Sequence, residues 1–472
     1  MTKKKVVLYN PVSVFYDMPL ALLAIGSCLD PKRYEVIIVD GRVDKSPLKK
    51  VLEACDDAIC FGVTALTGAP LKDAVKVTRA VKAKFPSLTI VWGGWHPSLF
   101  PTETLRDEPA IDISVQAQGE ETFVEIVNRV AEGGEFDDVK GITYRNADGG
   151  IVKNLGRPLQ DVNFFPTVNY DLIKVENYFK FKKNRQFDYI SSAGCRFRCT
   201  FCADPFVYKR GWTALQPERM GEELEFWKKK FNFTDINFQD ETFFTKRKRV
   251  VAISEEFINR NLQTTWAGTM RADQGFRLKE EEFDLCKKSG LRRVLVGVES
   301  GSQEMMDWLM KDIKIEQVYD TARRCAERDI AVIFPFIVGF PGESEDSVRS
   351  TLKTALELNS MHPLFTTPIF YFKPYPGSKI TQDVVAKGYQ LPQTLSEWSD
   401  FDYIGSSGPW VSKAKFELIE RFKFYNKVAG RRQNILTKPL QAIAQLRCKM
   451  NFFAMPIEKL VYEKLVPQQK LS

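Results

Sequence analysis

Histidine is almost missing from this chain, whose 472 residues include two, His96 and His362. A structural zinc site takes four Cys or His ligands, so no such site can be built mainly from histidine here. Cysteine is sparse too, and nine residues in a chain of this length cannot form a dense disulfide framework. Disulfide-stapled and histidine-rich metal proteins are therefore excluded.

Long apolar runs are also missing. The longest obvious one, Val332 to Phe340, contains a proline and is about half of the roughly 18 residues that a membrane-spanning helix needs. At the N-terminus, Lys3 to Lys5 are followed by an apolar stretch too short for a secretion signal. The sequence therefore predicts neither a spanning segment nor a secreted protein.

A general basic surface is missing as well. The formal net charge is +8, but residues 412–472 alone carry 13 Lys or Arg and 4 Asp or Glu, a balance of +9. The first 411 residues therefore carry about −1 (8 minus 9), which predicts no nucleic-acid partner. With 44% hydrophobic and 27% charged residues the chain is globular, and its length predicts two or three domains.

Three of the nine cysteines, Cys195, Cys199 and Cys202, form a C-x3-C-x2-C run on a glycine-containing loop after a strand-like stretch. Iron–sulfur clusters are held by thiolates on short loops, because the loop must wrap a compact cluster while several sulfurs point inward. Three thiolates leave one iron of a four-iron cluster free to bind a small molecule. The alternative is a structural zinc site, for which Cys286 or Cys325 would have to fold back as a fourth ligand.

The run, with the aromatic Phe201 before its third cysteine, resembles the cluster loop of the radical S-adenosylmethionine (SAM) enzymes. The resemblance implies a [4Fe–4S] cluster whose open iron chelates the amino and carboxylate groups of SAM. It also implies cleavage of SAM to a 5′-deoxyadenosyl radical, with the electron supplied by an external donor such as a flavodoxin or ferredoxin. Such a cluster indicates a reducing cytoplasm. The other six cysteines are expected to act as small hydrophobic side chains: Cys28, Cys55, Cys60, Cys286, Cys325 and Cys448.

The first 140 residues alternate β-rich runs with helical stretches, which predicts a parallel, doubly wound, Rossmann-like sheet. Such a sheet binds ligands beyond the carboxyl ends of its strands. The expected strands are Lys5–Tyr9, Tyr34–Asp40, Ala58–Val63, Thr89–Trp92 and Ile111–Val115.

Small residues follow these strands, and glycine lets a flat, bulky ligand approach the backbone. Thr64-Ala65-Leu66 and Gly93-Gly94 resemble the elements that line the cofactor cleft of the cobalamin-binding domain found at the front of many radical SAM enzymes. The resemblance implies seven cobalamin-binding residues: Thr64, Leu66, Gly93, Gly94, His96, Gly119 and Glu120.

The chain departs from the best-known cobalamin proteins in one respect. Their D-x-H-x-x-G signature, whose histidine ligates cobalt from below, is absent, since Asn10 to Val14 contain no histidine. Either the cobalt has no protein ligand on its lower face, or the domain has lost the cofactor and is a plain Rossmann-like domain. His96 is expected to pack against the backbone or contact the cofactor's tail rather than ligate cobalt.

The βα alternation resumes after a connector at 141–187, for which a hairpin and an extended crossing are expected. Six further strands at 188–385 make the partial (β/α)6 barrel that the resemblance implies, with its chemistry at the carboxyl ends. They are expected at Tyr189–Ser192, Asp235–Gln239, Thr264–Met270, Arg293–Val298, Ala331–Val338 and Pro368–Phe372.

SAM is a zwitterion with a sulfonium, so its site needs acceptors for the ammonium and donors for the carboxylate. The resemblance implies SAM-binding residues at successive strand ends: Phe201, Gln239, Asp240, Glu241, Arg271, Glu299, Ser300 and Gly339. Acidic residues in such places are also common helix N-caps, and Arg271 serves a structural ion pair equally well. No residue that donates or accepts the reacting hydrogen is identified.

The C-terminal region, 386–472, is expected to be mostly helical and basic, with a turn cluster at Gly405 to Gly408. Its amphipathic helices favour either a lid whose apolar stripe packs on the barrel or peripheral contact with an anionic membrane face.

The combination resembles the cobalamin-binding branch of the radical SAM enzymes. It implies methylation of an unactivated carbon of a bulky, lipid-like small molecule. Ring closure, rearrangement or oxidation without methyl transfer is the alternative. A methylthiotransferase would need a second cluster loop, and a cobalamin or redox sensor would need an output module; neither is evident in the sequence.

Overall fold

The computed structural model describes residues 2–401, 408–429, 438–450, 452–453 and 456–459. The chain divides into two compact units. Unit 1 comprises residues 1–243, 252–266 and 374–403, and unit 2 comprises residues 244–251, 267–373 and 404–472. The domain boundaries expected from the sequence, at residues 140, 187 and 385, differ from the bounds of these two units and stay a prediction.

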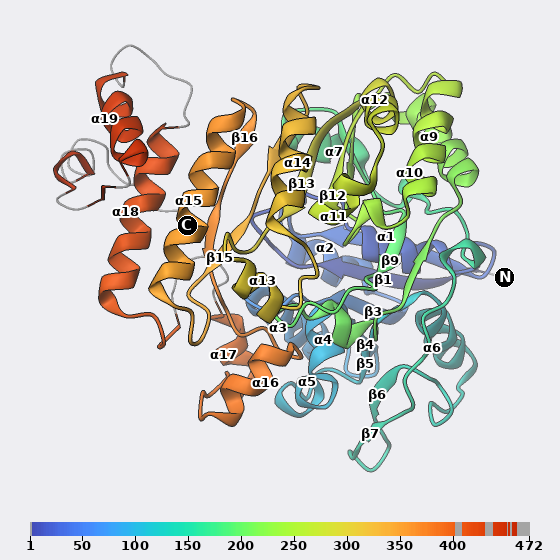
Figure 1. The fold of residues 1–472 in the computed structure, drawn as a ribbon. Coiled ribbons are helices and arrows are strands. Elements are labelled where there is room, and N and C mark those ends of the chain that lie inside the picture. Colours follow the sequence, from blue (N-terminus) through green and yellow to red (C-terminus); the bar gives the residue numbers. More distant parts are fainter. Residues whose placement is uncertain (1, 402–407, 430–437, 451, 454–455, 460–472) are drawn as a thin grey trace. The chain divides into compact units, whose positions relative to one another are not determined.

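Unit 1 contains a seven-stranded sheet with the order β2-β1-β3-β4-β5-β6-β7 (Figure 1). Its first five strands pair in parallel, and β6 and β7 are antiparallel. The doubly wound sheet is confirmed. The strands are β1 (Lys4–Asn10), β2 (Tyr34–Asp40), β3 (Ala58–Thr64), β4 (Thr89–Gly93), β5 (Ile113–Val115), β6 (Ile142–Arg145) and β7 (Ile151–Lys153).

The hairpin expected in the connector is β6–β7, and it extends this sheet instead of leaving it. All three residues of β5 pair with β6, so the hairpin satisfies backbone groups that an edge strand would leave open. The six helices of this part are α1 (Leu20–Ser27), α2 (Pro47–Ala54), α3 (Pro70–Lys84), α4 (Trp95–Leu99), α5 (Pro101–Asp107) and α6 (Glu120–Glu132).

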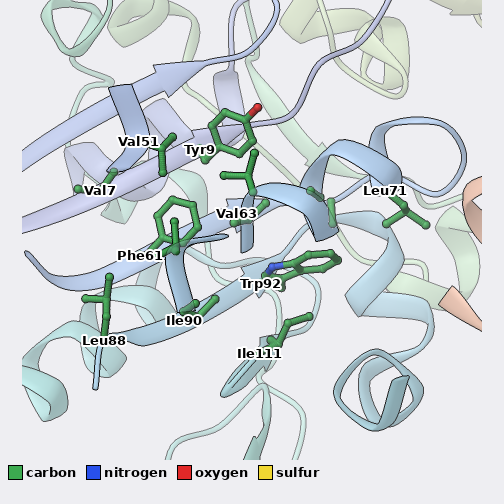
Figure 2. Close-up of a cluster of buried hydrophobic side chains, with 14 of the residues drawn as sticks. Val7, Tyr9, Val51, Phe61, Val63, Leu71, Leu88, Ile90, Trp92 and Ile111 are labelled. Carbon is green, nitrogen blue, oxygen red and sulfur yellow. The ribbon is translucent and has the colours of Figure 1, made fainter. Parts of the chain in front are cut away.

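Alternation along the strands sends side chains to two separate cores, because successive residues of a strand point to opposite faces. Val7 and Tyr9 of β1 join one cluster, in which Phe61 and Trp92 are fully buried (Figure 2). Val6 and its neighbours pack in the other cluster. The sheet is thus buried on both faces, as a doubly wound fold requires.

The first of these cores is completed by residues far away in the sequence. Leu395 and Trp398 of α17 (Leu395–Ser399) belong to it and are 5% and 3% exposed. The backbone N–H of Gly68 donates to the carbonyl of Trp398 at 3.1 Å. The hydrophobic core of unit 1 is therefore complete only when α17 is packed against it.

The cysteine run lies in the remainder of unit 1, where β8 pairs in parallel with β11 and β9 pairs antiparallel with β10. The elements are α7 (Val175–Lys182), β8 (Gln186–Tyr189), β9 (Ser192–Gly194), α8 (Asp204–Val207), β10 (Trp212–Ala214), α9 (Pro217–Phe231), β11 (Asp235–Phe238) and α16 (Lys379–Ala386). Helix α10 (Arg247–Asn259) and strand β12 (Thr265–Arg271) have residues in both units.

Unit 2 continues the βα alternation of the partial barrel, with β13, β14 and β16 in parallel and β15 parallel to β17. The single strand expected at Ala331–Val338 is two strands, because Pro335 has no N–H for a ladder and separates them. The elements are α11 (Ala272–Arg277), α12 (Glu280–Lys288), β13 (Leu291–Gly297), α13 (Gln303–Trp308), α14 (Ile315–Ala326), β14 (Ala331–Ile333), β15 (Phe336–Val338), α15 (Glu345–Met361), β16 (Phe365–Thr366), β17 (Ile369–Tyr371), α18 (Lys413–Ala429) and α19 (Lys438–Lys449).

The helical character expected of the C-terminal region 386–472 is confirmed by α17, α18 and α19. Helix α18 buries Ile419, Phe422 and Tyr425, as an amphipathic helix packed on a domain does. The turn cluster at 405–408 lies outside the described residues except for Gly408. Among the described residues, no helix combines the length and the apolar character needed to cross a membrane.

Candidate functional site

The cysteine loop of unit 1 starts at Gly194, the last residue of β9. Gly194 has φ +82°, and a Cβ there would collide with the carbonyl oxygen of Gly211. Glycine is therefore required both by the backbone and by the close approach of the neighbouring chain. This turn leads the chain from the β9–β10 pair into Cys195.

All three cysteines of the run are free thiols with partly exposed side chains. Burial raises the pKa of Cys195 to about 11 and raises the pKa of Cys202, where the charge of Asp204 adds to the effect. Thiolates are the ligands of iron–sulfur clusters, so these sulfurs fit a cationic cluster that stabilises their charged form. Among the described residues, no group of three or more Cys, His, Asp or Glu side chains is arranged to hold a metal ion, so the assignment rests on the type of donor and on the spacing of the cysteines.

Glu241 follows β11 and is a buried carboxyl close to a second one. Burial, and next the charge of Asp204, raise the pKa of Glu241 to about 8. Its Oε2 is buried without a hydrogen-bond partner among the described residues. A cationic ligand beside these carboxyls would relieve their repulsion, which fits the ammonium group of SAM. The sequence pointed to Glu241 but not to Asp204.

Asp240, the neighbouring predicted acceptor, already receives hydrogen bonds from the protein. Ser191 donates to it from its backbone N at 3.1 Å and from its hydroxyl at 2.8 Å, and Ser192 donates from its hydroxyl. Asp240 therefore fastens the chain just before the cysteine loop. Gln239 donates from its backbone N to the carbonyl of Tyr189 at 2.9 Å, and Phe201 is partly buried.

The predicted SAM residues of unit 2 form their own network. Arg271 pairs with Asp273 at 2.9 Å and donates to the carbonyl of Lys311. Lys311 in turn pairs with Glu299 at 2.7 Å, so this carboxylate is neutralised inside the unit. The ion pair expected as one role of Arg271 is present, and its role as a SAM-binding residue stays a prediction.

The remaining two predicted residues of unit 2 are also held in place. The hydroxyl of Ser300 lies 3.0 Å from that of Thr351 and accepts from the backbone N of Ser302. Gly339 has φ +75° and begins a loop directly after β15.

On the cobalamin side, Gly94 joins the ends of β3 and β4. Its φ is +96°, and a Cβ there would lie 3.0 Å from both the carbonyl oxygen of Ala65 and the hydroxyl of Thr64. The N–H of Ala65 donates to the carbonyl of Gly93 at 2.8 Å. The two predicted elements are thus side by side at the carboxyl edge of the sheet, where ligands of such folds bind.

Gly93 and Gly119 differ from Gly94, because packing does not require them. A Cβ on Gly93 would meet no atom closer than 3.8 Å, and one on Gly119 none closer than 3.5 Å. Leu66 is 37% exposed, and burial raises the pKa of Glu120. Open backbone beside an exposed apolar side chain fits a large flat ligand.

His96 points into the protein. It is 1% exposed, its Nδ1 lies 3.1 Å from the hydroxyl of Thr67, and its ring packs against Phe100 and Trp398. Burial lowers the pKa of His96 to about 4, which keeps the ring neutral. These contacts agree with the packing role expected for it.

The loop after β1 exposes apolar side chains that were not singled out from the sequence as a site. Val12, Val14, Phe15 and Tyr16 are 45%, 70%, 60% and 39% exposed. The backbone N of Val12 donates to Asp73 at 2.9 Å, so the loop is held while its side chains face outward. Of the cysteines before residue 140, which were expected to act as small hydrophobic side chains, Cys55 and Cys60 are buried and Cys28 is partly buried.

Tyr208 is a partly buried side chain in unit 1 that charges from both predicted sites influence. Burial is the main cause that raises its pKa, followed by the charges of Glu241, Asp204 and Glu120. Its ring packs edge-on against Trp95 of α4, with the centroids 6.1 Å apart. The charges of a predicted SAM residue, Glu241, and of a predicted cobalamin residue, Glu120, therefore both act on this tyrosine.

Comparison with known families assigns both parts of the chain. The Radical SAM superfamily matches residues 189–355, and the B12 binding domain matches residues 7–127. Among solved structures, the cobalamin-dependent SAM radical enzyme OxsB, with aqua-cobalamin and SAM bound, has a TM-score of 0.76 at 19% identity, over 99% of this chain and 74% of that chain. This likeness shows the fold.

Three curated relatives extend the comparison. An uncharacterized methyltransferase of Pyrococcus horikoshii is 29% identical over 85% of this chain and 86% of its own length. An anaerobic magnesium-protoporphyrin IX monomethyl ester cyclase of Rubrivivax gelatinosus is 28% identical over 68% of this chain and 58% of its own. The hopanoid C-3 methylase of Methylococcus capsulatus is 23% identical over 68% of this chain and 60% of its own length. With a B12-binding domain at 7–127 ahead of a radical SAM domain at 189–355, the chain carries the two domains of the cobalamin-binding radical SAM enzymes, and solved structures of the same fold hold a [4Fe–4S] cluster, SAM and cobalamin.

Proposed function

We propose that this enzyme methylates an unactivated carbon of a bulky, lipid-like small molecule. The observation that supports it most is that Glu241, a predicted SAM residue, and Glu120, a predicted cobalamin residue, both raise the pKa of Tyr208 through their charges. Methyl transfer of this type needs the radical source and the methyl donor close together. The cofactors supply the radical and the methyl group; the protein positions them and excludes water.

The residues of unit 1 have distinct roles in this proposal. Cys195, Cys199 and Cys202 hold the cluster, and Glu241 accepts the ammonium of SAM. Asp240 keeps the cysteine loop in place through its serine contacts. Arg271, Glu299, Ser300 and Gly339 remain predicted SAM residues from the resemblance.

Cobalamin would lie against the open backbone at Gly93 and Gly119, with Thr64 and Leu66 beside it. The outward apolar side chains of Val14 and Phe15 would then cover part of the cofactor. His96 would support the Gly94 turn from inside the protein and leave cobalt without a ligand from this residue.

The lipid-like substrate class has two supports. One relative is named as a methylase of hopanoids, which are lipids, and the C-terminal region combines basic and apolar residues. Another relative is named as a cyclase, so ring closure without methyl transfer is the second candidate.

Anaerobic reconstitution with iron, sulfide, cobalamin and SAM carrying a deuterated methyl group tests the function. With a lipid extract as substrate, we expect 5′-deoxyadenosine together with a lipid that has gained the labelled methyl group. A product without the label would favour the cyclase-type reaction. Absence of 5′-deoxyadenosine with every reductant, flavodoxin and ferredoxin included, would refute the radical mechanism.

Two variants with matched controls test the assigned residues. Cys199→Ala should lose the iron–sulfur absorbance and all SAM cleavage, whereas Cys28→Ala should keep both. Glu241→Gln should weaken SAM binding about ten-fold or more, since a charge-assisted hydrogen bond is lost, while the iron content stays unchanged. The exposed Glu222→Gln is its control.

We also propose that α19 contacts an anionic membrane surface. Ile443 and Leu446 of α19 and Met450 directly after it are 38%, 56% and 64% exposed. Lys449 is exposed beside them, and residues 412–472 carry a net +9. Apolar side chains among lysines and arginines suit a negatively charged bilayer. Co-sedimentation with phosphatidylglycerol vesicles should exceed that with phosphatidylcholine vesicles and should fall in Leu446→Glu. Equal sedimentation with both would refute this contact.

A further inference from the structure

The loop that follows β15 in unit 2, residues 339–343, is held by hydrogen bonds to its own last residue, Glu343. The buried carboxylate of Glu343 accepts from the backbone N of Gly339 at 2.6 Å and from the N of Phe340 at 3.2 Å. The hydroxyl of Ser347, in the first turn of α15, donates to it at 3.3 Å. Glu343 therefore ties the start of the loop to the helix that follows.

The same loop is held a second time by a segment about 70 residues later in the chain. The indole Nε1 of Trp410 donates to the carbonyl of Gly339 at 2.5 Å. At the other end, the Nζ of Lys415 donates to the carbonyl of Glu343 at 2.6 Å. The segment 410–415 is thus hydrogen-bonded to a backbone carbonyl at each end of the loop.

Packing reinforces these two hydrogen bonds. A Cβ on Gly339 would lie 2.7 Å from a methyl carbon of Val411, so the segment also sits directly against the loop. The ring of Trp410 is 5.9 Å from that of Phe372, which is 4.8 Å from the ring of Phe340. Trp410 is therefore packed on the aromatic ring that supports the second residue of the loop.

The carbonyl of Gly339 matters because it sets the orientation of the next peptide plane. Gly339 has φ +75°, a conformation that glycine leaves and enters readily. The hydrogen bond that its carbonyl accepts from Trp410, and the two that the N–H groups of Gly339 and Phe340 donate to Glu343, restrict this freedom. Without the indole donor, the loop would sample more than one arrangement.

We infer that Trp410 and Lys415 are positioning residues for SAM, acting by holding the 339–343 loop in the conformation that binds it. This inference rests on the proposed function, in which Gly339 is a SAM contact. It assigns to the C-terminal region a part in cofactor binding, in addition to any contact with lipid. Neither residue touches SAM in this account, so the effect is on affinity and not on chemistry.

The test is SAM binding by calorimetry to the anaerobically reconstituted holoenzyme. Trp410→Phe keeps a ring but removes the donor, and Lys415→Met keeps the stem but removes the donor. We expect each to raise the Kd of SAM about three- to ten-fold, the effect of a single hydrogen bond. The KM for SAM should rise in parallel, and kcat for 5′-deoxyadenosine at saturating SAM should stay within two-fold.

Trp308→Phe is the matched control, because the Trp308 ring lies 6.0 Å from Phe340 and this tryptophan donates no hydrogen bond to the loop within the described residues. It should change the Kd less than two-fold. An unchanged Kd in both Trp410→Phe and Lys415→Met would overturn the inference, as would a fall in kcat with an unchanged KM. If Trp410→Phe does not fold, Lys415→Met alone decides. A wild-type enzyme that does not bind SAM would instead overturn the proposed function.

Discussion

The buried imidazole of His96 predicts a specific loss of stability in acid. Burial lowers its pKa from 6.5 to about 4. Between these values the unfolded chain binds a proton that the folded protein does not, so stability falls as the pH falls from 6.5 towards 4. Above pH 7 the contribution is fully present, and below about pH 4 it is fully lost.

The size of the effect follows from the shift. A shift of about 2.5 pKa units corresponds to roughly 3 kcal/mol in total, of which about 2 kcal/mol is lost by pH 5. The Thr67 hydroxyl, 3.1 Å from Nδ1, stays within reach of an amide side chain in His96→Gln. This variant should be less stable than the wild type at pH 7.5 but should lose about 2 kcal/mol less between pH 7.5 and 5.

Urea unfolding at pH 7.5, 6.5, 5.5 and 5.0, followed by tryptophan fluorescence, measures the slope. Both proteins must unfold with the same dependence on urea concentration for the comparison to hold. Identical pH slopes for the wild type and His96→Gln would refute the assignment of a neutral, buried imidazole. A steeper slope in the variant would do the same.

Three further predictions concern unit 1. Gly94→Ala should destabilise the protein by about 1–3 kcal/mol in thermal melts, because φ is +96° and the added Cβ would meet Ala65 and Thr64. Gly93→Ala should change the stability little but should weaken cobalamin binding, which equilibrium dialysis measures. Equal stability losses at both glycines would contradict this reading. Tyr178→Phe should cost about 2 kcal/mol in a urea titration, since its hydroxyl donates to the buried carboxylate of Asp40 at 2.5 Å. Its control is Tyr319→Phe in unit 2, a half-buried tyrosine whose hydroxyl donates to the more exposed carboxylate of Glu357, and this variant should cost under about 0.5 kcal/mol. Phe61→Ala, in the fully buried core of Figure 2, should cost about 3–5 kcal/mol, and a loss below 1 kcal/mol would show that the core there is not packed as described.

Local patterns were sufficient for most of the first sheet. The run from Tyr34 to Asp40 is strand β2 to the residue, because β-branched and apolar side chains suit a sheet buried on both faces. The cysteine run was recognisable because it is local too: thiolates that hold a cluster from one short loop must be close together in the sequence. Where one residue changes backbone chemistry, as Pro335 does between β14 and β15, the expected strand was too long.

Tertiary contacts were beyond reach of the sequence. Nothing local indicates that the Asp240 carboxylate receives hydrogen bonds from Ser191 and Ser192, or that Arg271 pairs with Asp273. Both side chains had the right chemistry for SAM, and only the fold reveals which partners they already have. Asp204 was missed because a carboxyl two residues after a cysteine has no distinguishing signal.

The packing of α17 against the N-terminal sheet has a consequence for how the protein can be made and divided. Trp398 covers a surface beside His96 and Phe100, which lie about 300 residues earlier in the chain. During synthesis this surface stays open until the ribosome has released nearly the whole chain. A fragment that ends after the B12-binding segment would expose this apolar surface to solvent. The N-terminal domain should therefore be expressed together with α17 and not alone.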